Sequence, residues 1–167
     1  MANTFELINN LKAQMYEIQV EVLEGGTLPT KAHADDAGFD VYATSDIVVW
    51  PGQVVKHPLN IRMKIPAGSY LSIESKSGLG AKGLLVYAGV IDAGYRGIPH
   101  VVMTNLRTRD DDGNLLDINK AKIVIPKGAK LAQMIPYQFS TQYYVTQVES
   151  VDTDTSRAAG GFGSSGQ

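Results

Sequence analysis

The stretch AGVIDAGYRG, residues 88–97, places a carboxylate where an apolar run ends. Asp92 follows Val90 and Ile91, and a turn of small residues then presents Tyr95. A carboxylate at the end of a buried strand, beside an aromatic ring, is suited to act as a general base toward water. The same residues also fit an Asx turn with a packed tyrosine, so this stretch alone leaves two interpretations open.

A second stretch, ESKSGLGAKG (residues 74–83), is a glycine-rich turn with polar side chains. Ser77 offers a hydroxyl, Gly78 exposes its backbone N–H, and Lys76 adds positive charge, which together suit an anion such as phosphate. The GxxxxGK[ST] pattern of a P-loop is absent. A plain hairpin turn is the alternative interpretation.

Two polar side chains stand within apolar strands. Asp40 opens the strand of DDAGFDVYA (35–43), and Gln133 interrupts PKGAKLAQMIP (126–136). A buried amide needs hydrogen-bond partners, which a ligand can supply. Asp40 also fits a turn-capping role, which is the simpler explanation for it taken alone.

The chain closes with SRAAGGFGSSGQ, residues 156–167. Such a composition is typical of a flexible Gly/Ser tail or of a linker left by expression. However, Arg157 and Phe162 stand at fixed positions among small residues, which indicates that the tail contacts a binding partner.

Composition excludes several classes of function. The chain has 167 residues, a net charge of −2 and no cysteine, so thiol catalysis and disulfides are ruled out. Without a basic surface, a nucleic-acid polymer is a poor partner. The three histidines, His33, His57 and His100, do not have metal-ligand spacing. With no signal-peptide start and no membrane-spanning run, we expect a soluble, cytoplasmic protein that contacts no membrane.

The elements that must hold these side chains are mostly strands. Residues 16–23 and 59–66 alternate apolar and polar with period two, and glycines separate further short runs of the same kind. We therefore predict an all-β, single-domain sandwich or barrel over residues 16–150. Residues 1–15 form a short extension that is expected to be helical, 108–120 an exposed hairpin excursion, and 151–167 a flexible C-terminal arm.

Taken together, these stretches resemble the five ordered motifs of the homotrimeric dUTP pyrophosphatase (dUTPase) family. The resemblance is to a phage or bacterial member of that family. AGFDVYA is similar to the first motif, KSGLG to the second and GVIDAGYRG to the third. KGAKLAQMI is similar to the fourth and RAAGGFGSSG to the fifth. The resemblance implies a jelly-roll-like β-clip barrel, a homotrimer with shared active sites, and Mg²⁺-dependent cleavage of dUTP to dUMP and diphosphate.

The resemblance also implies a role for each candidate. Asp92 would activate the attacking water, and Tyr95 would exclude a ribose 2′-hydroxyl. Asp40 would act on the metal through water, without a direct protein ligand. The remaining expected substrate-binding residues are Lys76, Ser77, Gly78, Gly89, Val90, Ile91, Gln133, Arg157, Phe162, Gly163, Ser164 and Ser165. Lys76 stands where the family usually has arginine, and a lysine lacks the planar two-pronged contact with phosphate.

Other readings compete with this one. A dCTP deaminase shares the fold but needs a glutamate on the strand after the third motif, and residues 98–105 contain no acidic residue. A regulatory binding protein on the same fold would use the acidic excursion at 108–120 as its partner surface, against the simpler reading of a solvated loop. A single-strand nucleic-acid binder needs a basic groove with stacked aromatics, which the sequence lacks.

Overall fold

The computed structural model describes residues 16–151 and Asp154. The helix predicted within residues 1–15 and the tail motif at 156–167 lie outside the described residues. The division into extension, barrel and arm therefore stays a prediction.

Short strands make up nearly all of the regular structure. The strands are β1 (Gln19–Val22), β2 (Phe39–Tyr42), β3 (Ile47–Val49), β4 (Val54–Pro58), β5 (Ile61–Lys64), β6 (Ser69–Glu74), β7 (Leu84–Tyr87), β8 (Val90–Asp92), β9 (His100–Asn105), β10 (Ile123–Ile125) and β11 (Lys130–Gln138). Two single-turn helices, α2 (Ser77–Gly80) and α3 (Ile118–Ala121), interrupt them. The all-β prediction is confirmed. No helix in the described part of the chain is long and apolar enough to cross a bilayer.

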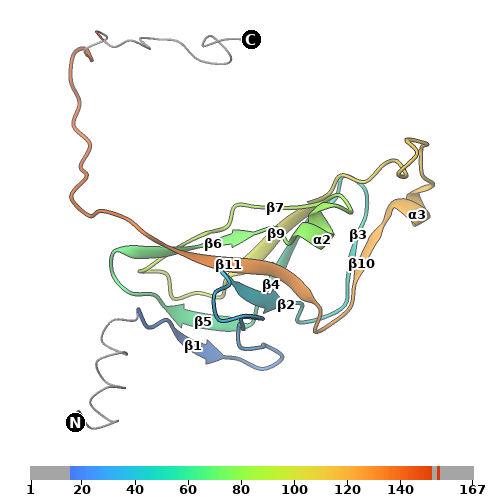
Figure 1. Cartoon of the computed structure of the whole chain (residues 1–167), viewed down its shortest axis with the longest axis horizontal. Coiled ribbons are helices and arrows are strands. Elements are labelled where there is room, and N and C mark those ends of the chain that lie inside the picture. Colours follow the sequence, from blue (N-terminus) through green and yellow to red (C-terminus); the bar gives the residue numbers. More distant parts are fainter. Residues whose placement is uncertain (1–15, 152–153, 155–167) are drawn as a thin grey trace.

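The strands form antiparallel sheets that wrap around one core (Figure 1). The largest sheet has the order β2-β11-β6-β8, and a second has the order β4-β9-β7. Two pairs, β1 with β5 and β3 with β10, complete the arrangement. Many neighbours in these sheets are distant in sequence, as in a jelly roll. The consequence for function is that β8, which ends in Asp92, is an edge strand of the largest sheet.

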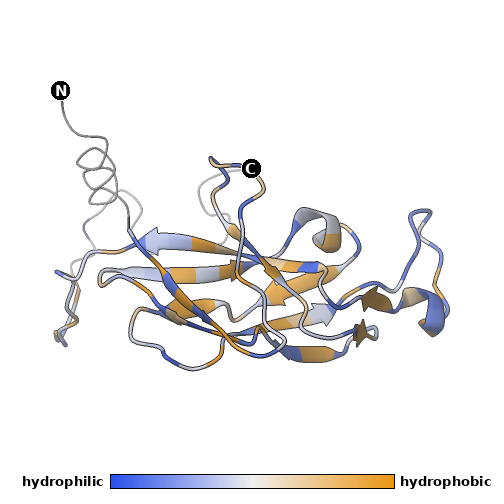
Figure 2. Cartoon of the chain, turned by 90° about the horizontal axis from the view of Figure 1, so that it is seen from below, coloured by the Kyte–Doolittle hydropathy of each residue, from blue (hydrophilic) through white to orange (hydrophobic). Residues whose placement is uncertain are grey.

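Alternation of side chains decides which face of each strand is buried. In β5, Ile61 and Met63 are buried while Arg62 and Lys64 are exposed, as period two predicts. The strands β6 and β9 alternate in the same way. Figure 2 shows much of the apolar colouring within the strands, between pale and polar bands, and mainly polar or pale colouring in the loops. Each fully buried aliphatic side chain stabilises the fold by roughly 1.5–3 kcal/mol.

One buried amide ties the far end of the barrel together. The Asn105 side chain is fully buried and donates from Nδ2 to the carbonyls of Val49, at 2.9 Å, and Ala121, at 2.8 Å. Its Oδ1 accepts from the backbone N–H of Arg107 at 2.8 Å. All the polar atoms of this amide are therefore engaged, as a buried amide requires. The contacts hold β9, β3 and α3 in place at the base of the excursion.

Candidate active site

Asp92 ends the edge strand β8 and points its carboxylate toward solvent. It lies opposite Tyr70 of β6, and its carbonyl accepts from the backbone N–H of Tyr95 at 3.0 Å. The Arg96 guanidinium donates to the carbonyls of Ala93, at 2.6 Å, and Tyr95, at 2.9 Å. Arg96 therefore closes the turn, and the Asp92 side chain has no partner among the described residues.

Tyr95 is held firmly although its ring is half exposed. Its hydroxyl donates to the carbonyl of Ile98 at 3.1 Å. A Cβ at Gly97 would stand 2.5 Å from the hydroxyl oxygen of Tyr95, so only glycine leaves room for the ring there. A ring fixed in this way can exclude groups by shape rather than by weak contact.

The short connection from β7 to β8, which lie in different sheets, packs tightly against β6. Ala88 turns the chain with a φ of 54°, and a Cβ at Gly89 would stand 2.4 Å from the carbonyl oxygen of Ile73. The backbone N–H of Ile73 donates to the carbonyl of Gly89 at 2.9 Å. The close backbone approach expected at Gly89 is therefore present.

A cavity of about 230 Å³ lies beside this connection. It brings together five of the sequence-predicted residues: Gly89, Val90, Ile91, Asp92 and Tyr95. Its other walls come from β4, β6 and β9 and include Lys56 and His100, which sequence reasoning did not single out. Because β8 is an edge strand, backbone N–H and C=O groups on its outer side are not paired with β6 and can bond a ligand.

A second polar cluster lies on the same sheet around Asp40. The Asp40 side chain is buried, and its two oxygens each face a lysine. The Nζ of Lys76 is 2.5 Å from Oδ1, and the Nζ of Lys130 is 2.7 Å from Oδ2. Burial raises the pKa of Asp40, but the bonds from both lysines outweigh it, so the pKa lies below its ordinary value. The bond to Asp40 raises the pKa of Lys130.

Gln133 belongs to the same cluster. It lies in register with Asp40 on one side and with Glu74 of β6 on the other. Its Nε2 donates to the carbonyl of Ser75 at 3.4 Å, a long bond that a better partner can replace. Gln133 is half buried, so its amide is accessible to a ligand.

Ser77 and Gly78 begin the single-turn helix α2 directly after this cluster and are both exposed. A Cβ at Gly78 would meet nothing within 4 Å, so the backbone there is open to solvent. Leu79, which packs against the core, anchors the turn. The second predicted stretch therefore presents its hydroxyl and backbone beside the Asp40 cluster.

Asp92 and the Asp40 cluster are separate within one chain. Asp92 faces Tyr70 on β6, whereas Gln133 faces Glu74, four residues further along the same strand. With about 3.3 Å per residue and roughly 4.8 Å between strands, Gln133 and Asp92 are roughly 16 Å apart across the sheet. One chain therefore presents two separate candidate sites, a pocket at Asp92 and a charged cluster at Asp40.

Lys130 is a site residue that sequence reasoning missed. Strict alternation along β11 would put Lys130 and Gln133 on opposite faces. The register shifts between Lys130 and Ala132, and Leu131 and Ala132 are buried in succession. This β-bulge turns Lys130 to the face that carries Asp40. Two successive apolar residues after a lysine were the available signal.

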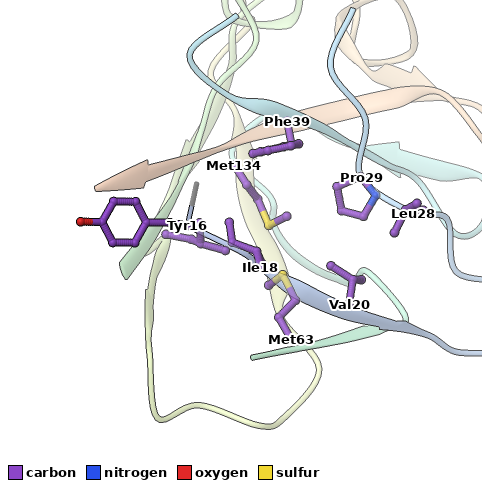
Figure 3. A pocket seen from close by; sticks show the side chains of 9 residues that line it. Tyr16, Ile18, Val20, Leu28, Pro29, Phe39, Met63 and Met134 are labelled. Atoms are coloured by element: carbon purple, nitrogen blue, oxygen red, sulfur yellow. The ribbon is translucent and has the colours of Figure 1, made fainter. Parts of the chain in front are cut away.

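The largely apolar pocket in Figure 3 holds none of the predicted site residues. It lies between β1 and the inner face of the large sheet, and its walls are mainly aliphatic, methionine and aromatic side chains, including Ile18, Phe39 and Met134. The described residues that line it include no charged side chain, so they do not supply the acid–base chemistry expected at Asp92.

The excursion at 108–120 is an ordered hairpin. The Asp110 carboxylate accepts from the backbone N–H groups of Asp112, at 3.1 Å, and Asn114, at 2.8 Å. Hydrogen bonds from Asn114, more than the one from Asp112, hold the pKa of Asp110 below its ordinary value. The Arg109 guanidinium donates to the carbonyl of Gly113 at 2.7 Å. A regulatory partner for this hairpin stays a prediction.

Five predicted residues, Arg157, Phe162, Gly163, Ser164 and Ser165, lie outside the described residues. Their roles therefore stay predictions as well.

Comparison with protein families is decisive for the assignment. The dUTPase family model matches residues 24–166. The chain belongs to the dUTPase family. The matched range contains both Asp40 and Asp92.

Individual relatives agree. The chain is 38% identical over 145 residues to the deoxyuridine 5′-triphosphate nucleotidohydrolase of Nocardia farcinica, covering 85% of this chain and 80% of that protein. It is 35% identical over 147 residues to the mitochondrial human enzyme of that name, covering 86% of this chain and 52% of that protein.

Solved structures of phage dUTPases share the fold. The dUTPase of Staphylococcus bacteriophage 80alpha, solved with dUPNHPP, superposes with a TM-score of 0.76 at 27% identity, covering 90% of this dUTPase and 99% of that chain. The dUTPase of phage phi11 of S. aureus, described with a species-specific insert, gives a TM-score of 0.68 at 27% identity, covering 82% and 99% of the two chains.

Proposed function

We propose that this dUTPase hydrolyses dUTP to dUMP and diphosphate. The observation that carries the proposal is the pocket that joins the outer edge of β8, the fixed ring of Tyr95 and the Asp92 carboxylate, which has no partner within the described part of the chain. An edge strand offers alternating N–H and C=O groups, which match the acceptor–donor–acceptor edge of uracil. Close packing at Gly89 leaves this edge rigid, which favours uracil over thymine with its added methyl group.

In this proposal Asp92 accepts a proton from water as the water oxygen attacks the α-phosphorus. The bond from the α-phosphorus to the oxygen that bridges it to the β-phosphorus breaks, and that oxygen leaves with diphosphate. Ser77 donates to this oxygen, where negative charge develops, while Lys76 and Arg157 neutralise the outer phosphates. Tyr95 packs against the deoxyribose and occupies the space of a 2′-hydroxyl.

Magnesium fits the Asp40 cluster as a partner held through water. Mg²⁺ keeps several waters and neutralises charge on the triphosphate when it binds. Asp40 is an ionised, buried carboxylate, and Gln133 offers an accessible amide oxygen. Both can accept from metal-bound water. The proposed substrate, dUTP, also agrees with the cytoplasmic location expected from the sequence.

The nucleotide specificity is testable with purified protein and Mg²⁺. Diphosphate release is expected from dUTP, with dCTP, dTTP and UTP cleaved at least about 100-fold less efficiently, because a site built on hydrogen bonds and shape rejects misfits strongly. Ammonia release from dCTP would instead indicate a deaminase. Equal kcat/KM for UTP and dUTP would contradict the role of Tyr95.

We further propose that the active site is shared between chains of a homotrimer. The separation of Asp92 from the Asp40 cluster supports this, because Asp92 and Ser77 are both proposed to act at the α-phosphate and must lie next to it. The tail motif at 156–167 then completes a site on a neighbouring chain, with Phe162 on the uracil ring and with Gly163, Ser164 and Ser165 near the terminal phosphate.

Subunit mixing tests the shared site. The variants Asp92→Asn and Ser77→Ala are each expected to be inactive, but co-refolding them in equal amounts is expected to restore roughly a quarter of the sites, since chains assort at random in a symmetric oligomer. Activity is measured after mixed and after separate refolding. If mixing restores nothing, both residues act from the same chain.

A further inference from the structure

The two lysines on Asp40 reach it from different parts of the chain. Lys76 follows β6 and bonds Oδ1, while Lys130 begins β11 and bonds Oδ2. The backbone of Asp40 is held as well, because its N–H donates to the carbonyl of Thr30 at 2.6 Å and its carbonyl accepts from the Thr30 N–H at 3.2 Å. The carboxylate is therefore fixed between two ammonium groups.

Lys130 offsets negative charge in this cluster. Asp40 and Glu74, which both lie in register with Gln133, carry two negative charges, and Lys76 with Lys130 carries two positive charges. Without Lys130 the cluster would have a net negative charge. A cluster with that charge would repel a triphosphate, since charges in a partly buried site are only partly screened by water and salt.

Lys76 can bind phosphate only if its ammonium group is not fully engaged by the Asp40 carboxylate. An ammonium group has three N–H donors in no fixed plane, so Lys76 can keep one bond to Asp40 and offer the others to an anion. This sharing is favourable when a second cation already compensates the carboxylate. Lys130 stands in the position to do so, and its side chain is 45% exposed at the rim of the cluster.

We propose that Lys130 is a positioning residue of the phosphate end of the site. By holding Oδ2 of Asp40, it keeps that carboxylate ionised and oriented and leaves the charge of Lys76 available to the triphosphate. Lys130 acts through Asp40 and does not touch the reacting atoms. This inference rests on the proposed dUTP hydrolysis and assigns a residue that the five motif roles leave unused.

The test compares Lys130→Met with Lys127→Met. Lys127 lies in the turn just before β11. Its backbone N–H donates to the Asp46 carboxylate at 2.7 Å, a contact that methionine keeps. Lys130→Met is expected to raise KM for Mg·dUTP about 5- to 10-fold with kcat within about twofold, as for loss of one partly exposed charge. Lys127→Met is expected to leave both constants unchanged. Raising the KCl concentration is expected to narrow the KM difference between Lys130→Met and the wild type.

Lys130→Arg is expected to restore KM, because arginine keeps the charge at Oδ2. If Lys130 had only a structural role, its replacement would lower thermal stability without raising KM selectively over kcat. Melting temperatures are therefore measured on all three variants. Equal KM values for Lys130→Met and Lys127→Met would overturn the proposal, as would a KM difference that is insensitive to salt. If Lys130→Met does not fold, Lys130→Gln replaces it.

Binding of inorganic tripolyphosphate to the same variants, measured by calorimetry, separates this inference from the proposed function. If the wild type cleaves no dUTP, the proposed function is wrong. Weaker tripolyphosphate binding in Lys130→Met than in Lys127→Met would still support the role of Lys130. Equal binding would overturn it.

Discussion

Replacing Asp92 by asparagine is expected to lower kcat about 100- to 10,000-fold, the range typical of removing a general base. Asparagine has the same shape but cannot accept the proton of the attacking water. The Asp92 carboxylate has no hydrogen bond within the described part of the chain, and the turn is held by its backbone carbonyl. Folding and nucleotide binding are therefore expected to survive. Single-turnover kinetics with dUTP and the Kd for a non-hydrolysable α,β-imido analogue measure the two effects.

Asp111→Asn is the matched control. Asp111 is an exposed aspartate of the 108–120 hairpin, and its side chain makes no hydrogen bond among the described residues. Its replacement is expected to leave kcat unchanged. Near-normal turnover in Asp92→Asn would show that another group activates the water. A loss of analogue affinity as large as the loss of kcat would show that Asp92 acts in binding.

The strands could be predicted from the sequence because one face of each is buried. In residues 59–66 a period-two pattern identifies both the strand and its inner face, and the structure confirms it. The close packing at Gly89 was also predictable, since a glycine between two apolar runs usually marks close backbone approach. These features depend on residues near one another in the chain.

The arrangement around Asp40 could not be predicted in the same way. Its three neighbours, Lys76, Lys130 and Gln133, come from two segments far along the chain, and pairing of distant strands brings them together. The β-bulge in β11 also breaks the alternation that would otherwise assign a face to Lys130. A single polar residue opening a strand does not reveal such partners.

The separation of Asp92 from Gln133 is a second feature that sequence order hides. Motif order along the chain gives no distance, and only the register on β6 shows that the two residues face positions four residues apart. The proposal of a second chain rests on this register, because Asp92 and Ser77 are both proposed to act at the α-phosphate.

Gly89→Ala is expected to disable the pocket and to destabilise the fold. The added Cβ would stand 2.4 Å from the carbonyl oxygen and 2.8 Å from the backbone nitrogen of Ile73. β6 cannot retreat, because it lies between β11 and β8 in the sheet. The connection between β7 and β8 must therefore shift and lose the bond from the Ile73 N–H, with a loss of about 2–4 kcal/mol in the free energy of unfolding. Urea denaturation measures this loss.

Nucleotide affinity is expected to fall at least about 100-fold in the same variant, because displacement of β8 moves the backbone groups proposed to bind uracil. Gly94→Ala is the control, since a Cβ at Gly94 in the neighbouring turn meets nothing within 4 Å. It is expected to match the wild type in stability and in Kd for the imido analogue. If Gly89→Ala binds as well as Gly94→Ala, the nucleobase does not depend on the rigid edge of β8, and its site must be sought elsewhere on the chain.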